Sequence, residues 1–151
     1  MWFMNKFVNP IVRLILQSPL HGIMSTSLLL ITYQGRKSGK AYTLPVQYIQ
    51  DDHLIYILPG APEQKTWWRN LRGGAPVSLQ LVGKTLSGKA DVFEGIAGIP
   101  QITQGLILFL QRFPAAAKMH GVHVDKDGSF DKDEVSRVAT STVVVRVELD
   151  S

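Results

Sequence analysis

Strand-like runs of apolar residues recur along the chain after residue 26. Five such runs cover 27–33, 42–49, 53–58, 75–82 and 84–94, and the last two alternate apolar and polar positions as half-buried strands do. A β-branched run at 140–149 predicts a sixth strand. Pro45 lies inside the second run and cannot donate to a ladder. It therefore marks an edge, a bulge or a place where the backbone faces a ligand.

Three further segments have helical patterns. A short helix is predicted within residues 1–20, a second of one or two turns at 63–71 carries two adjacent tryptophans, and a mostly apolar third covers 99–113. We therefore predict one domain over 1–151 of the mainly β (α+β) class. Its core is a small barrel of about six strands, mostly antiparallel, with an N-terminal helix, a short Trp-bearing helix and a helix before the last strand.

The first 20 residues allow two interpretations. Asn9 can cap the helix and Pro19 can end it, and an apolar face would let it pack over a barrel mouth or an acceptor pocket. Trp2, Phe3 and Lys6 form an aromatic and basic start that favours contact with a membrane surface. No signal-peptide pattern or long apolar run is present, so we expect a cytoplasmic protein, with membrane contact on the cytoplasmic face as the alternative.

Charge is distributed unevenly. Residues 1–50 contain five basic residues and no acidic residue, whereas residues 120–151 contain seven acids and four bases. A locally basic half suits a small anion better than nucleic acid, and no nucleic-acid-binding motif is present. The chain has no cysteine, which excludes disulfides, thiolate metal sites and cysteine nucleophiles.

The segment "GRKSGK" at 35–40 joins the first two predicted strands. It is not a P-loop, because only three residues separate Gly35 from Gly39 and a strand rather than a helix follows. A turn there offers Arg36, Lys37, Ser38 and backbone N–H groups to one phosphate. An ordinary polar hairpin has the same composition, so the local pattern leaves both interpretations open.

Lys65 and the Trp67–Trp68 pair form a second candidate. Adjacent helical residues point about 100° apart, so one indole can enter the core while the other walls a groove for a planar ligand. Both indoles could equally anchor the helix to the barrel.

The remaining motifs predict no metal. The acidic segment 125–134 resembles a calcium loop, but Phe130 stands where that loop needs glycine, so we interpret the segment as a solvated turn. His120 and His123 lack further ligands. No nucleophile-elbow pattern or triad is recognisable, so the reactive group of an enzyme built on this chain would come from a cofactor.

The ordered motifs between about Leu28 and Phe93 resemble the deazaflavin (coenzyme F-420)-dependent nitroreductases, also called F-420-dependent quinone reductases. They are the T-x-x-GRKSG turn, the P-V-x-Y strand, and the W-x-N-L helix followed by a proline and a strand. These families belong to the split β-barrel flavin and deazaflavin oxidoreductases. The resemblance implies a split barrel and hydride transfer from reduced coenzyme F-420 to a quinone, an enone or a similar conjugated acceptor.

The resemblance also implies the site. Arg36, Lys37 and Ser38 would bind the cofactor's phosphate, and Leu44, Pro45 and Val46 would lie along the deazaflavin ring. Gly60, Ala61 and Lys65 would lie near the phosphate or tail, and Trp68 and Asn70 match the helix signature. Tyr48 is the candidate catalytic proton donor. Relatives carry tyrosines before the last strand that are missing here, which leaves the acceptor's identity open.

Three alternatives accompany this hypothesis. FMN could replace F-420, because the same barrel superfamily uses it. The chain could instead be a non-catalytic flavin or deazaflavin carrier, or a module that contacts membranes through residues 1–20. A homodimer is a further expectation from the superfamily.

Overall fold

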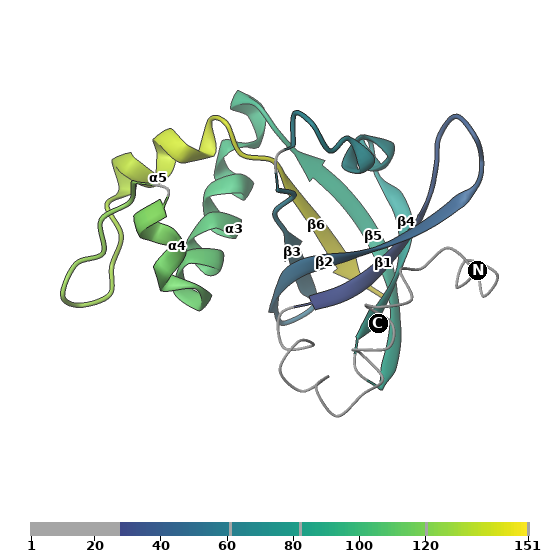
Figure 1. Ribbon diagram of the computed structural model, residues 1–151, viewed down its shortest axis with the longest axis horizontal. Helices are drawn as coiled ribbons and strands as arrows, with labels where there is room; N and C mark the ends of the chain where they lie inside the picture. Colours follow the sequence, from purple (N-terminus) through teal and green to yellow (C-terminus); the bar gives the residue numbers. More distant parts are fainter. Residues whose placement is uncertain (1–27, 61, 82, 120, 151) are drawn as a thin grey trace.

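The computed structural model describes residues 28–60, 62–81, 83–119 and 121–150. The helix and the membrane contact predicted for residues 1–20 lie outside this range. Six strands form a closed barrel in the order β1-β2-β3-β6-β5-β4 (Figure 1). Their bounds are β1 Leu28–Gln34, β2 Ala41–Asp51, β3 Leu54–Ile57, β4 Ala75–Leu81, β5 Lys84–Phe93 and β6 Val144–Leu149. Every pairing is antiparallel, which confirms the predicted fold class.

The barrel interior is filled by the inward-facing residues that alternate along the strands. Leu29, Ile31 and Tyr33 of β1 are buried there, together with residues of the five other strands and of the Trp-bearing helix. That helix is a single 3-10 segment, η2, at Trp67–Leu71, shorter than the predicted 63–71. Thr66 precedes it without forming a side-chain cap.

Strand β2 changes partner along its length. From Ala41 to Gln47 it pairs with β1, and from Tyr48 to Asp51 it pairs with β3. Pro45 lies in the first part, opposite Leu30 of β1. Its missing N–H is tolerated because no pairing with β3 reaches this part of β2.

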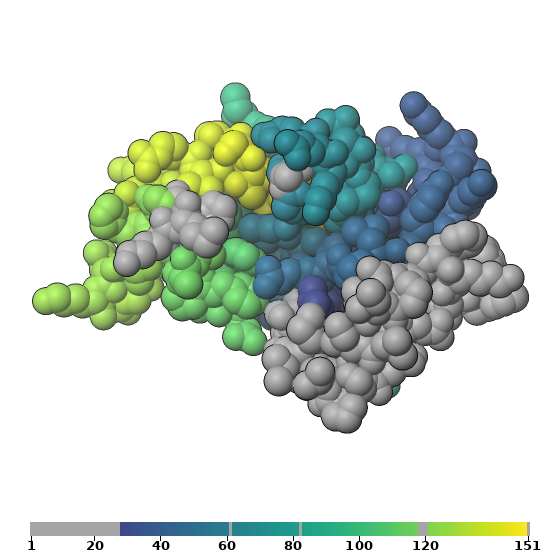
Figure 2. Space-filling model, viewed as in Figure 1, coloured from purple at the N-terminus to yellow at the C-terminus, as the bar shows by residue number. Residues whose placement is uncertain are grey.

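A helical layer covers one side of the barrel, next to β3 and β6 (Figure 1). It contains η3 (Ile96–Gly98), α3 (Ile99–Arg112), α4 (Pro114–Met119) and α5 (Lys132–Ala139). Helix α3 approaches the barrel closely at Gly105, where an added Cβ would lie 3.1 Å from the ring of Tyr56. In the space-filling view the layer forms a lobe beside the barrel (Figure 2).

Helix α5 was not predicted, because its segment was interpreted as part of a solvated acidic turn and an undefined run before the last strand. The Asp131 side chain caps it, accepting hydrogen bonds from the backbone N–H groups of Asp133 and Glu134. Val135 and Ala139 are its buried residues. The acidic residues of this stretch therefore begin a helix in addition to being exposed to solvent.

Candidate functional site

The turn between β1 and β2 is held by its own backbone and by short side chains. Gly35 N–H donates to Lys40 O at 2.7 Å, and Gly39 N–H donates to Gly35 O at 2.9 Å. The Ser38 hydroxyl accepts from Lys40 N–H at 3.1 Å and lies 3.1 Å from the Tyr42 hydroxyl. An added Cβ on Gly35 would lie 2.8 Å from the Tyr42 ring, so only glycine allows this packing. The turn is therefore shaped before any ligand arrives.

Asn70 of η2 joins this turn to the Trp-bearing helix. Its Oδ1 accepts from Arg36 N–H at 3.0 Å, and its Nδ2 donates to Trp67 O at 2.8 Å. Both ends of the amide are thus engaged with backbone groups. Asn70, predicted to bind the cofactor, fixes the position of Arg36 relative to Trp67.

Arg36, Lys37, Ser38 and Asn70 line one pocket of about 600 Å³, which we call the cationic pocket. Its other walls are Tyr33, Gly35, Tyr42, Thr66, Trp67, Arg69 and Arg72. No acidic residue among those that the structure describes lines it. Arg72 is bound to Glu94 through two contacts of 2.7 Å, whereas no ion pair involves Arg36 or Lys37 in the described part of the chain. Two exposed cations without a carboxylate partner favour an anionic ligand.

Leu44, Pro45, Val46, Gly60 and Lys65 line a second pocket of about 510 Å³, which we call the apolar pocket. Besides β2 and the segment after β3, it takes its walls from α3 and from the segment between α5 and β6. These walls include Gln47, Leu58, Trp67, Leu106, Phe109, Val138, Ser141, Thr142 and Val143. Its volume and mainly apolar walls are those of a site for a planar organic ligand.

Trp67 lies at the boundary of the two pockets. It lines both, and its ring centroid is 5.8 Å from that of Tyr33. Trp68, predicted to contact the cofactor, is only 3% exposed and lines neither pocket. Its Nε1–H donates to Pro62 O at 3.1 Å. The sequence pattern allowed either indole to enter the core, and only the packing of η2 on the barrel distinguishes them.

Tyr48, the predicted proton donor, lies apart from the pockets. Tyr48 lines neither of them and packs against the barrel core. Burial raises the pKa of its hydroxyl, while the nearby charge of Arg112 lowers it by less, so Tyr48 keeps its proton at neutral pH. Ala61 lies outside the described residues.

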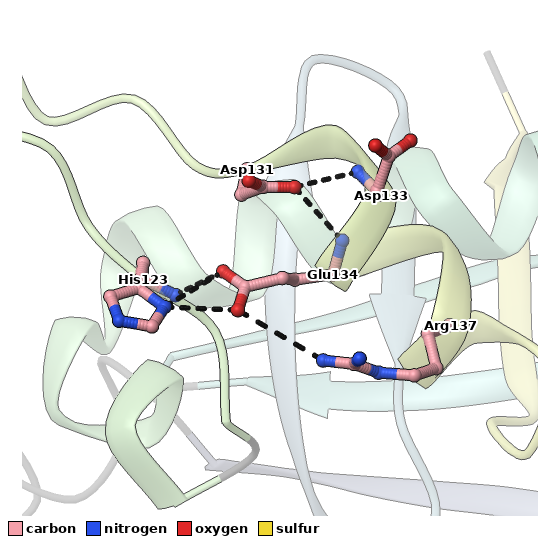
Figure 3. A network of polar contacts seen from close by, with 5 residues as sticks. All are labelled: His123, Asp131, Asp133, Glu134 and Arg137. Carbon is pink, nitrogen blue, oxygen red and sulfur yellow. Dashed lines mark hydrogen bonds and ion pairs between the residues drawn. The ribbon is translucent and has the colours of Figure 1, made fainter.

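The α5 wall of the apolar pocket is attached to the preceding loop by a polar network (Figure 3). His123 turns toward Glu134 of α5, with Nδ1 2.9 Å from Oε2, and its backbone N–H donates to Oε1 at 2.8 Å. Glu134 raises the pKa of His123, and His123 lowers the pKa of Glu134. Arg137 approaches the same carboxylate at 3.9 Å.

Nothing in the described residues points to a metal centre or a membrane span. No group of three or more His, Cys, Asp or Glu in those ranges is arranged to hold a metal ion. No described helix is long and apolar enough to cross a bilayer.

Several residues that line the pockets were not among the predicted site residues. Arg69 is exposed next to the tryptophans, Trp67 was considered only as a pair with Trp68, and Val138 belongs to the unpredicted helix α5. The basic character of Arg69 and the Asp131 cap were signals in the sequence. The convergence of α3 and α5 on β2 has no local signal.

The comparisons with known proteins concern the family and the fold of the chain. A family model described as F420H(2)-dependent quinone reductase matches residues 16–97. No match was found among curated proteins. One solved structure with the same fold is an F420-H2 dependent reductase, FDR-A, with 21% identity and a TM-score of 0.54, covering 81% of this chain and 94% of that one. Another, described as a domain-swapped dimer, has 19% identity and a TM-score of 0.55, covering 93% of this chain and 100% of that one.

Proposed function

We propose that the cationic and apolar pockets of this chain, which belongs to the F420H(2)-dependent quinone reductase family, together hold coenzyme F-420. The chain belongs to that family because the matched segment spans more than half of it. The protein is an oxidoreductase that uses this cofactor, and a quinone-type small molecule fits the family as its acceptor. When bound, the reduced cofactor supplies the hydride. The protein's own residues bind and orient the cofactor and the acceptor, and they exclude water.

The single observation that carries the assignment of the pockets is their adjacency. Among the described residues, the cationic pocket is lined by no acid and by cations without an ion pair, Arg36 and Lys37 among them, and it shares the wall of Trp67 with the apolar pocket. A ligand with a phosphate at one end and a flat ring at the other suits this pair. The residues present therefore fit the cofactor.

Arg36, Lys37 and Ser38 would bind the phosphate. The guanidinium and ammonium provide charge-assisted hydrogen bonds, each worth about 1.5–3 kcal/mol. The backbone N–H groups of Gly35 and Gly39 donate within the turn, so these two are not offered to the phosphate. Asn70 holds the backbone of Arg36 in place.

Leu44, Pro45 and Val46 would lie along the ring, with Gly60 and Lys65 at the opposite wall and Trp67 in place of Trp68 at the junction. Tyr48 remains the proposed proton donor, although burial raises the pKa of its hydroxyl and so makes it a weaker acid. Because it lines neither pocket, it is the first predicted site residue to test. If Tyr48→Phe leaves kcat unchanged, the proton comes from elsewhere.

The assignment is tested by titrating F-420 into the full chain and following its fluorescence, with FMN as the competing cofactor. Arg36→Ala should weaken F-420 binding about 10- to 100-fold. Lys84→Ala removes an exposed lysine that lines neither pocket and serves as the matched control. Unchanged affinity in Arg36→Ala, or tighter binding of FMN than of F-420, would contradict the proposal.

Two statements about partners also remain proposals. A homodimer is suggested by the superfamily and by the relative described as a domain-swapped dimer. Light scattering should then give twice the chain mass of 16.8 kDa. Membrane contact through residues 1–20 predicts co-sedimentation with anionic vesicles that is lost when those residues are removed.

A further inference from the structure

We propose that the apolar pocket, beside the cofactor's ring, takes conjugated acceptors that carry a carboxylate, and that Lys65 binds this carboxylate. The inference rests on the proposed function for the acceptor's role, and the binding preference itself can be measured separately. It begins with the charge of the pocket. Among the described residues that line it, Lys65 is the only one with a charged side chain.

The two hydroxyls among the described lining residues of the pocket are engaged. Thr142 Oγ1–H donates to Val138 O at 2.7 Å, and Ser141 Oγ–H donates to the same carbonyl at 3.3 Å. These hydroxyls end α5 and have no proton left for a ligand. Their remaining lone pairs can only accept. The remaining side-chain donors among the described lining residues are the neutral Gln47 amide and the Trp67 indole N–H, so Lys65 is the charged donor that the pocket offers to a carboxylate.

Lys65 is also without an internal partner. No ion pair involves it in the described part of the chain. The nearest acid in sequence, Glu63, lines a different and smaller pocket together with Trp68. An ammonium group beside aliphatic and aromatic walls, with no carboxylate to neutralise it, favours a ligand that combines an apolar ring with an anion.

The position of Lys65 separates it from the phosphate-binding residues. The resemblance places such a lysine near the cofactor's phosphate or tail, but Lys65 lines the apolar pocket and is absent from the lining of the cationic one. The cofactor's phosphate is already provided with Arg36 and Lys37. Lys65 is thus available to the second ligand of the reaction.

The test compares 2-naphthoate with its neutral methyl ester by calorimetric titration of the full chain saturated with F-420, so that the cofactor occupies the cationic pocket and its ring lies in place beside the acceptor's part of the apolar pocket. We expect the wild-type protein to bind the acid about three- to tenfold more tightly than the ester, as for a partly exposed ion pair against an apolar wall. Lys65→Arg should keep the preference, Lys65→Gln should abolish it and Lys65→Glu should reverse it. Lys84→Gln, the matched control, should leave it unchanged.

Three results would overturn the inference. They are equal affinity of the wild-type protein for acid and ester, a preference that survives Lys65→Gln, and a loss of F-420 affinity in Lys65→Gln, which would assign Lys65 to the cofactor. Failure of F-420 to bind the wild-type chain would instead contradict the proposed function. In that case the titration is repeated without cofactor in Arg36→Ala. A preference for the acid over the ester that is lost when Lys65→Gln is added to Arg36→Ala supports the inference. A preference that is absent or unchanged overturns it.

Discussion

The cationic and apolar pockets share one wall but are built in different ways. Most of the cationic pocket comes from one hairpin turn and one short helix, joined by the amide of Asn70. The apolar pocket takes its walls from β2, the segment after β3, α3 and the end of α5. In a pocket formed by adjacent segments, residues close together in the sequence supply the ligand-binding groups. The apolar pocket is assembled from distant segments and depends on how the helical layer packs on the barrel. Substitutions in the two pockets should therefore have different effects on stability and on binding.

Neighbouring tryptophans should give the largest contrast. Trp68→Ala removes a buried indole and its hydrogen bond to Pro62 O, and should lower the free energy of unfolding by about 3–5 kcal/mol. Urea denaturation of the variant and the wild type measures the loss. Such a cost would place Trp68 in the structure of the barrel rather than in the recognition of ligand.

Trp67→Ala is the companion variant. Trp67 is half-buried, so the loss of stability should be smaller, about 1–2 kcal/mol, while F-420 affinity should fall because both pockets lose their common wall. If Trp67→Ala is as destabilising as Trp68→Ala and binds F-420 normally, the roles given to the two indoles are wrong.

Removing both unpaired cations tests the cationic pocket alone. Arg36→Ala combined with Lys37→Ala should weaken F-420 binding at least about 100-fold, since two charge-assisted contacts are lost. Stability should change little, because both side chains are exposed and form no ion pair in the described residues. Binding of methyl 2-naphthoate should stay at the wild-type value. A parallel loss of ester binding would show that the two pockets are not energetically separate.

Asn70→Ala should have a smaller effect on the same pocket. The variant keeps every cation but loses the hydrogen bonds to Arg36 N–H and Trp67 O, so F-420 affinity should fall about three- to tenfold. Gln80→Ala, an exposed amide on β4 that lines neither pocket, is the control. Wild-type affinity in Asn70→Ala would show that the turn holds its shape without the amide.

The same division explains what could be predicted from the sequence. The strands follow from their apolar patterns, and the GRKSGK turn shows its chemistry in six consecutive residues. The choice between Trp67 and Trp68 could not be made locally, because a five-residue 3-10 helix gives no lasting periodicity. Helix α5 has only a few apolar residues in an acidic stretch, so its cap at Asp131 was the one strong signal. Phe109 and Val138 line the same pocket as Pro45 only because of tertiary packing.

The smallest expected effect concerns the polar network behind the apolar pocket. The pKa of His123 is raised from 6.5, so its charged form stabilises the fold fully below pH 6.5, and this stabilisation is lost as the pH rises through the raised value. The pKa of Glu134 is lowered from 4.5, so its contribution is present above pH 4.5 and lost as the pH falls through the lowered value. Between the lowered pKa of Glu134 and the raised pKa of His123 both groups are charged, and Asp131 and Asp125 add to the attraction on His123.

His123→Gln should therefore lower Tm more at pH 5.5 than at pH 8.5, by a small amount because the imidazole is exposed. Thermal unfolding of this variant at the two pH values, with Ser136→Ala on the exposed side of α5 as the control, measures the difference. An equal loss at both pH values would mean that the backbone hydrogen bond from His123 to Glu134, rather than the charge pair, attaches α5 to the loop.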